Sequence, residues 1–267
     1  MPTNSPALFY RGFPAYGATS SVRQITTAAL TSNLVTITLS ANHGFTQIGQ
    51  LVAIQGVGAS YDGVYPVYTY PALNTFTYVK TNANIGSASV TPNASATFNT
   101  ASAGGNISNN AVTNYVAIVT TSSAHGLAVG DIVAVNTGTT GTETAAAVVT
   151  SIPTTTTFTY NSNTQTVANA AISQGAWSKY PAVYTLGAGT TGVVTNIVLN
   201  NPQQAAQGSA VFNISVAGTP VVANYTLLSG NSSVIDLRSY LGTTGDKIYV
   251  SSSVPSGTAT ISGMTIV

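Results

Sequence analysis

An internal duplication limits the possible folds of this chain more than any other feature of its sequence. The stretch SANHGFTQIGQLVAI around His43 returns as SSAHGLAVGDIVAV around His125, an offset of 82 residues. Downstream, TYPALNTFTY (69–78) matches SIPTTTTFTY (151–160) at the same offset. A repeat of this length indicates one structural unit used twice, so the sequence predicts two similar units in tandem.

Strand signals fill the chain, and helical periodicity is almost absent. The segment LVTITLS (34–40) alternates apolar and threonine side chains, as a half-buried strand does. Few segments lack glycine, proline or β-branched residues for more than two helical turns, and Gly-Thr-Thr-Gly recurs as a turn signal. The predicted fold class is all-β, with two small barrel or sandwich repeats followed by a β-sandwich of immunoglobulin-like or jelly-roll type.

Five segments are predicted along the chain. Residues 1–24 are expected to form an extended N-terminal arm, 25–98 the first repeat, 99–110 a Gly/Ser/Asn-rich linker, 111–178 the second repeat and 179–267 the C-terminal sandwich. About seven sandwich strands are expected, near residues 182–186, 192–200, 209–217, 221–228, 232–237, 247–252 and 258–266.

Charge is scarce throughout the chain. Charged residues make up 4% of the sequence and the formal net charge is +1, against roughly 25% charged residues in an average soluble domain. Without a basic cluster, nucleic-acid binding is not expected. No apolar run approaches the roughly 20 residues of a membrane span, and the N-terminal stretch does not resemble a secretory signal, so we expect no membrane partner and production in a cytoplasm. The absence of cysteine excludes disulfides, thiolate nucleophiles and cysteine metal sites.

Each His-Gly dipeptide is interpreted as a turn between strands. Glycine adopts the positive φ that such a turn needs, and neither His43 nor His125 has a carboxylate at a spacing typical of a metal site. A ligand role for the histidines is the alternative. Asp131 and Asp246 each follow a glycine and precede alternating apolar residues, so they are interpreted as turn caps that accept backbone N–H groups. The first repeat has Gln50 in place of Asp131, so the carboxylate itself is not required there. No metal or cofactor is therefore predicted.

The carboxylates are too few and too scattered to predict catalysis. A polysaccharide hydrolase ordinarily needs two of them around the scissile bond, and Ser-nucleophile and phosphate-binding motifs are absent. The chain has five in all, Asp62, Asp131, Glu143, Asp236 and Asp246. We therefore predict no enzymatic activity and no catalytic residues; a depolymerase, the alternative, would depend on Asp62 or Glu143.

Aromatic side chains are the candidate interface residues. Those of the N-terminal arm are expected to dock on a neighbouring subunit or on the chain's own surface, since apolar groups on a free arm are costly to leave in water. Four tyrosines crowd one hairpin of the first repeat, where they either fill a sheet face or form an interface or sugar-stacking surface. The candidates are Phe9, Tyr10, Phe13, Tyr16, Tyr61, Tyr65, Tyr68 and Tyr70.

The order of these motifs resembles modules of virion proteins of tailed bacteriophages. The pattern is His-Gly-[Phe/Leu], a short turn with Gly, an apolar strand, a Gly-rich loop, then Pro and Phe-Thr-Tyr. The segments YTLGAGTTGVVTNIVLNNP (184–202) and GDKIYVSS (245–252) look like a β-sandwich module of phage tail, fibre and head-decorating proteins. Together the likenesses cover most of the chain after Ile25.

The resemblance implies a structural component of the virion, assembled in the host cytoplasm. Its expected partners are other copies of itself and other virion proteins, which it would contact through sheet edges and the N-terminal arm. The alternative is a receptor- or glycan-binding tail module with a host surface glycan as its partner. No catalytic residue is carried over from the resemblance.

Overall fold

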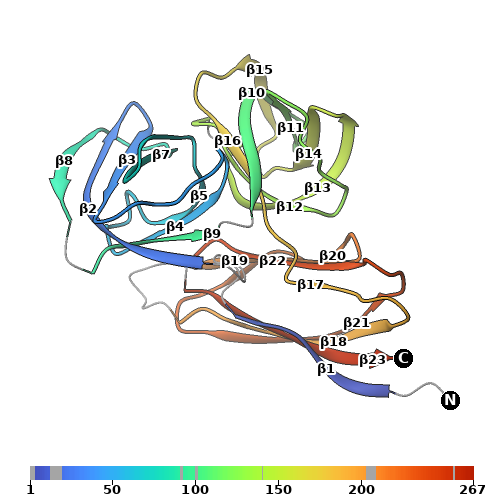
Figure 1. Ribbon diagram of the computed structural model, residues 1–267. Helices are drawn as coiled ribbons and strands as arrows, with labels where there is room; N and C mark the ends of the chain where they lie inside the picture. The colour runs from blue at the N-terminus through green and yellow to red at the C-terminus, as the bar shows by residue number, and fades with distance from the viewer. Residues whose placement is uncertain are drawn as a thin grey trace.

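A computed structural model of the protein describes residues 4–12, 20–90, 93–99, 102–139, 141–202, 209–254 and 256–267. Every regular element in these ranges is a β-strand, which confirms the predicted all-β class. The strands form two small barrels, which lie beside each other on one sheet of a β-sandwich (Figure 1). No helix of the described residues is long and apolar enough to span a membrane.

The sandwich has two four-stranded antiparallel sheets, ordered β1-β23-β18-β21 and β17-β22-β19-β20. Among consecutive strands of the sandwich, only β19 and β20 lie in the same sheet, and every other connection crosses to the opposite sheet. The first strand, β1, pairs with the last, β23. This is the jelly-roll arrangement, not the immunoglobulin one. Its strands are β1 (Asn4–Gly12), β17 (Tyr184–Thr185), β18 (Thr191–Asn200), β19 (Ala210–Val216), β20 (Thr219–Leu227), β21 (Ser232–Leu241), β22 (Lys247–Ser252) and β23 (Thr258–Ile266).

The first part of the N-terminal segment, expected to be an extended arm that docks on a neighbour or on the chain's own surface, is a strand of this chain's own sandwich. Strand β1 pairs antiparallel with β23 along its whole length, and Phe9 is 5% exposed in the sandwich core. A bulge between Leu8 and Tyr10 and the imino acid Pro6 hide the strand alternation in the sequence. The sandwich is therefore built from both ends of the chain, with the two barrels inserted between its first strand and its second, β17.

The first barrel is a curved sheet in the order β5-β4-β9-β2-β3-β7-β6, with β8 paired to β2. Strand β2 begins within the segment that was expected to be arm. The strands are β2 (Ser20–Thr31), β3 (Leu34–Leu39), β4 (Leu51–Gln55), β5 (Gly63–Pro66), β6 (Thr69–Ala72), β7 (Thr75–Val79), β8 (Ile85–Ser89) and β9 (Ser95–Asn99).

The second barrel has the order β11-β14-β13-β12-β16-β10-β15, and an additional pairing of β11 with β10 closes it, whereas among the described residues the sheet of the first barrel stays open between β5 and β6. Most of the expected linker, residues 103–110, belongs to the long strand β10, which serves both sides of the barrel. The strands are β10 (Ala103–Thr113), β11 (Val116–Thr121), β12 (Ile132–Asn136), β13 (Thr144–Thr154), β14 (Thr157–Asn161), β15 (Thr166–Ala171) and β16 (Ala176–Lys179).

Strand pairing repeats between the barrels at a nearly constant offset. Leu30 pairs with Ile85 in the first barrel, and Val112 pairs with Val167 in the second, 82 residues further on in both strands. One element differs, because β5 and β6 correspond to the single strand β13. Pro66 ends β5, and a proline cannot donate an N–H to the ladder.

Each barrel and the sandwich has its own apolar core, and a fourth cluster lies where the three meet. Strands β12 and β13 contact β19 and β22 of the sandwich. Side chains of the fourth cluster come from the outer faces of both barrels and from the sandwich, and are Leu51, Ala53, Val64, Ile132, Ala134, Ala146, Tyr180 and Tyr249. This junction packs the barrels against one sheet of the jelly roll.

Candidate functional site

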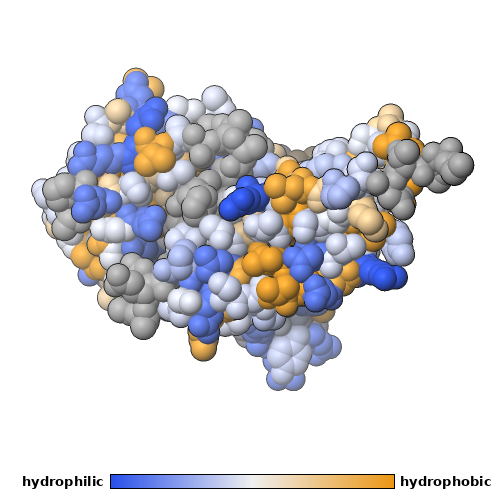
Figure 2. Space-filling view, turned by 90° about the horizontal axis from the view of Figure 1, so that it is seen from below, coloured by the Kyte–Doolittle hydropathy of each residue, from blue (hydrophilic) through white to orange (hydrophobic). Residues whose placement is uncertain are grey.

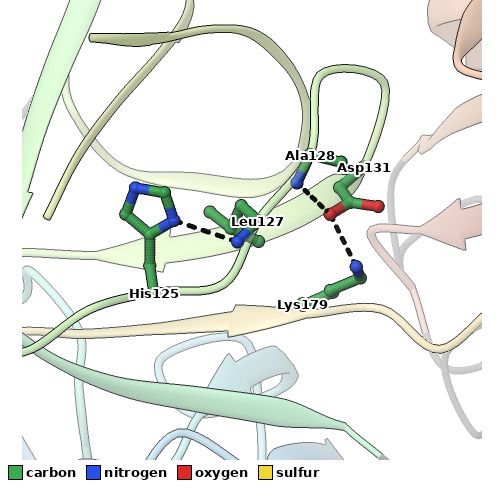
Figure 3. Close-up of polar contacts among 5 residues, drawn as sticks. All are labelled: His125, Leu127, Ala128, Asp131 and Lys179. Carbon is green, nitrogen blue, oxygen red and sulfur yellow. Dashed lines mark hydrogen bonds and ion pairs between the residues drawn. The ribbon is translucent and has the colours of Figure 1, made fainter. Parts of the chain in front are cut away.

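In the second His-Gly turn, the histidine side chain ties the turn to a neighbouring strand by hydrogen bonds. Nδ1 of His125 accepts a hydrogen bond from the backbone N–H of Leu127 at 3.0 Å (Figure 3). Nε2 lies 3.2 Å from the carbonyl oxygen of Thr154 on β13. An accepting Nδ1 implies that Nε2 carries the proton and donates it. Gly126 has a φ of 61° with open space around it, so backbone conformation is what requires glycine there.

The first turn repeats this geometry. Nδ1 of His43 accepts from the N–H of Phe45 at 2.9 Å, and Nε2 donates to the carbonyl of Ala72 at 2.8 Å. Gly44 has a φ of 76°. Both rings are buried and both fasten a turn to a strand 29 residues further along, so both nitrogens of each histidine are engaged inside its own barrel.

The residue after the next glycine caps the turn in both barrels. Oδ2 of Asp131 accepts from the N–H of Ala128 at 2.7 Å and forms an ion pair of 2.6 Å with Lys179 (Figure 3). In the first barrel Oε1 of Gln50 accepts from the N–H of Thr46 at 2.9 Å. The carboxylate is therefore a cap that a neutral amide replaces.

The Asp131–Lys179 pair lies against the sandwich. Nζ of Lys179 is 5.6 Å from the ring centroid of Tyr249 on β22. Burial, the charge of Asp131 and a hydrogen bond to it together raise the pKa of the Tyr249 phenol. The pair is the one ion pair among the described residues, and it stands where the second barrel meets the jelly roll.

Two equivalent glycines make the backbone contacts between units. A Cβ on Gly49 would lie 2.4 Å from the backbone nitrogen of Gly105 in the second barrel, and a Cβ on Gly130 would lie 2.3 Å from Cα of Gly218 in the sandwich. Their φ values are 82° and 89°. The same turn therefore docks the first barrel on the second and the second barrel on the sandwich. Sequence reasoning treated these glycines as turns and missed their docking role.

Asp62 and Glu143, the carboxylates of the depolymerase alternative, are equivalent residues. Asp62 directly precedes β5 and Glu143 directly precedes β13. These two strands pair with β4 and β12, the strands that follow the His-Gly turns. Asp62 accepts the backbone N–H groups of Gly56, Val57 and Gly58 at 3.0–3.2 Å. Both oxygens of this carboxylate are thus engaged by its own loop.

Glu143 faces a cleft of about 270 Å³ between the barrels. Its Oε1 accepts from the N–H of Gly138 at 2.8 Å, and Thr81 of the first barrel donates to it at 3.4 Å. Burial raises the pKa of Glu143, while these hydrogen bonds and the charge of Lys80 oppose the shift. Tyr65 also lines the cleft, and Nζ of Lys80 lies 5.3 Å from its ring centroid.

Among the described residues, the hydrogen-bond partners of Lys80 all belong to the first barrel. Its Nζ donates to the carbonyl oxygens of Ala59 at 2.9 Å and Asp62 at 3.1 Å. Burial lowers the pKa of Lys80, and the charges of Asp62 and Glu143 act the other way. The cleft thus carries one cationic side chain from the first barrel, Lys80, and one anionic side chain from the second, Glu143.

The remaining carboxylates also serve local structure. Oδ2 of Asp246 accepts from the N–H groups of Gly242 and Thr243 at 2.8 and 2.9 Å, as expected for a turn cap. Oδ1 of Asp236 accepts from Nδ2 of Asn196 at 2.8 Å on the outer face of the sandwich. The described residues contain no group of three His, Cys, Asp or Glu side chains that could hold a metal ion.

The four hairpin tyrosines are not brought together as a surface. Tyr61 is buried, Tyr65 stacks on Tyr78 with ring centroids 4.3 Å apart, and Tyr70 lies against His43. Tyr68 instead donates to the carbonyl of Ser173 in the second barrel at 3.0 Å. Three of the tyrosines fill their own barrel and one joins the two barrels.

The N-terminal aromatics belong to the jelly roll. Phe9 makes an edge contact with Tyr184 at 4.9 Å between ring centroids. Burial raises the pKa of Tyr10 to about 12. Phe13 and Tyr16 lie outside the described residues. The described part of the predicted arm interface is therefore part of the sandwich core.

The outer sheet of the sandwich carries the exposed apolar groups that sequence analysis did not single out. Figure 2 shows this side of the molecule, with apolar patches between polar ones. Leu8 is 61%, Met264 40%, Val234 62% and Tyr240 66% exposed. Register shows that Pro6, Met264, Val193 and Tyr240 form one row across all four strands, and this long-range pairing is invisible in the sequence.

These features define a class: a jelly-roll protein with a duplicated barrel between its first two strands. No family model and no curated protein matches the chain. Among solved structures, a chain of the T13 IBDV viral particle matches with a TM-score of 0.25 and 10% identity, over 94% of this chain and 71% of that chain. A similarity of this size carries no argument about function.

Proposed function

We propose that this chain is a non-enzymatic structural component of a virus particle of the tailed-phage type, as a tail, fibre or capsid-decorating protein. The observation that carries the proposal is the two-sided sandwich. The barrels cover one sheet, and the other exposes the apolar side chains of Leu8, Val234, Tyr240 and Met264. Among the described residues, its two outermost strands each have one unpaired edge. Exposed apolar sheet surface is typical of interaction sites, and jelly rolls are common in viral shells and lectins.

The placement of the charged groups supports assembly over catalysis. The five carboxylates accept hydrogen bonds from loop backbone or from neighbouring side chains. The resemblance of the repeat and sandwich motifs to phage virion modules points the same way. In this role the chain works as one of many copies on a lattice.

Quantitative mass spectrometry of purified particles from the source culture tests the proposal. The chain is expected in many copies per particle, and to remain through density-gradient purification. Its absence from particles, or its loss at the gradient step, would overturn the proposal. Deletion of residues 1–24 is not a suitable test, because it removes β1 from the sandwich core.

Glycan binding is the second candidate function, and the cleft between the barrels favours it. This cleft combines an aromatic ring, an ammonium group and a carboxylate in Tyr65, Lys80 and Glu143, groups that suit a sugar. A glycan array with the purified protein and its Lys80→Gln variant tests it. Binding that the variant loses supports this function, and no binding to any glycan excludes it.

A further inference from the structure

We propose that two copies of this chain join edge to edge through β21, antiparallel about a two-fold axis near Leu237, so that Asp236 of each copy faces Arg238 of the other. This inference rests on the proposed assembly role and names its partner as a second copy. The paired sheets would form one continuous eight-stranded sheet.

Strand β21 offers a long unpaired edge. Within the described residues it pairs only with β18, and its ten residues include no proline. Ile235 and Leu237 point into the sandwich core but stay only half-buried. A strand added at this edge would cover them. The opposite edge, β1, contains Pro6, which has no N–H to offer a partner.

The outward side chains of β21 alternate regularly through the strand, although its pairing with β18 shifts between Val194 and Asn196. They are Ser232, Val234, Asp236, Arg238 and Tyr240. Asn196 holds the carboxylate of Asp236 on this face. Among the hydrogen bonds and ion pairs of the described residues, none involves the guanidinium of Arg238. A charged donor is thus left two residues from an oriented acceptor.

Charge selects one register. With the axis at Leu237, Asp236 lies opposite Arg238 twice, and Val234 lies opposite Tyr240 twice. A shift of two residues one way sets Asp236 against its own copy, and a shift the other way does the same with Arg238; like charges directly opposite are destabilising. A shift of one residue sets outward side chains against inward ones.

The same register also joins the apolar rows. Tyr240 ends the row that runs through Val193 and Met264, and Val234 pairs with Val198 inside its own sheet. Tyr240 opposite Val234 of the second copy would therefore extend the apolar row of one sheet onto the other. Aromatic and β-branched residues form a favourable cross-strand pair.

Sedimentation velocity of charge-reversal variants tests the pairing. Wild type should dimerise with rising concentration, and Asp236→Arg or Arg238→Asp alone should weaken dimerisation at least tenfold. The double variant should restore it, since each Arg then faces an Asp again. The two single variants, mixed, should form a heterodimer. Lys247→Asp, an exposed reversal on the other sheet, should leave dimerisation unchanged.

Thermal unfolding of each variant, at a concentration where wild type is monomeric, separates folding from pairing, and all should then melt as wild type does because the side chains are exposed. Wild type that stays monomeric, single variants that dimerise normally, or a double variant that fails to recover would each overturn the β21 pairing. These outcomes leave the virion role to the particle analysis. A chain that pairs as expected but is absent from particles overturns the virion role alone.

Discussion

The two barrels share their interior and differ at the ends that dock. Each fastens its turn with a histidine that joins an N–H two residues ahead to a strand carbonyl. In the first barrel Phe98 packs on Phe45 near this turn, with ring centroids 4.9 Å apart. Strand pairing puts Lys179 at the corresponding place in the second barrel, where it binds Asp131.

The difference follows what each barrel meets. The first barrel docks on backbone glycines of the second, and its turn is neutral and aromatic. The second barrel docks on the sandwich, where its ion pair lies near the ring of Tyr249. The two copies of the repeat thus share the hydrogen bonds of the histidine turn and differ in the side chains that face their neighbouring units. The predictions below test this division, beginning with the largest expected effect.

Alanine at the docking glycines should break the contacts between units. Gly49→Ala and Gly130→Ala force a side chain into neighbouring backbone at a positive φ, at an expected cost of about 3 kcal/mol or more. Gly44→Ala and Gly126→Ala are matched controls, because they have positive φ but open space, and should cost about 1–2 kcal/mol. Urea unfolding measures both pairs. Equal losses in the two pairs would show that these glycines serve conformation alone.

Removal of the histidine side chains of the two turns should affect the two barrels equally. His43→Ala and His125→Ala each remove two hydrogen bonds from a buried site, with an expected loss of about 2–3 kcal/mol in the free energy of unfolding. Ser40→Ala and Ser122→Ala, at equivalent exposed positions before each turn, serve as controls with little effect. A loss in only one barrel would contradict their equivalence.

Transfer of the first barrel's cap to the second should leave Lys179 without its carboxylate. Asp131→Gln keeps an acceptor for the turn N–H but removes the ion pair, and should cost about 1–2 kcal/mol, since Lys179 is partly exposed. Lys179→Met in addition should recover part of this loss. A double-mutant cycle by urea unfolding measures the coupling. Additive losses would mean that the pair contributes nothing as a pair.

Local patterns revealed most of this architecture before the structure did. Each of the seven predicted sandwich strands overlaps one of β17–β23, because alternation and flanking turn signals mark the segments, although the bounds differ, as for residues 232–237 against β21. The pairing of residues 4–12 with 259–266 could not be read from the sequence, since it joins the two chain ends and a bulge disrupts its alternation. The docking role of Gly49 and Gly130 was equally hidden. A glycine required by a turn looks the same in sequence as one required by a neighbouring domain.

The equivalent carboxylates Asp62 and Glu143 should respond to neutralisation with opposite signs. Burial raises the pKa of Glu143 above its ordinary value of 4.5, so the folded state binds this proton more tightly than the unfolded state does. Its contribution to stability is therefore full below about 4.5 and is lost as the pH rises through the folded pKa. Glu143→Gln, which keeps an acceptor for Gly138, should stabilise the protein at pH 7 by less than about 1 kcal/mol.

That gain should shrink as the pH falls from 7 toward and below 4.5, since protonation progressively neutralises the wild-type carboxylate. Asp62→Asn should instead destabilise the protein at pH 7, because three backbone N–H groups share one acceptor oxygen in place of two. Urea unfolding of both variants at pH 4.5 and pH 7 checks the two signs. A loss at pH 7 from Glu143→Gln as large as that from Asp62→Asn would mean that the two loops have kept the same cap. Stability changes of opposite sign would show that Asp62 and Glu143, like the caps and the docking groups, differ between barrels that share the same interior.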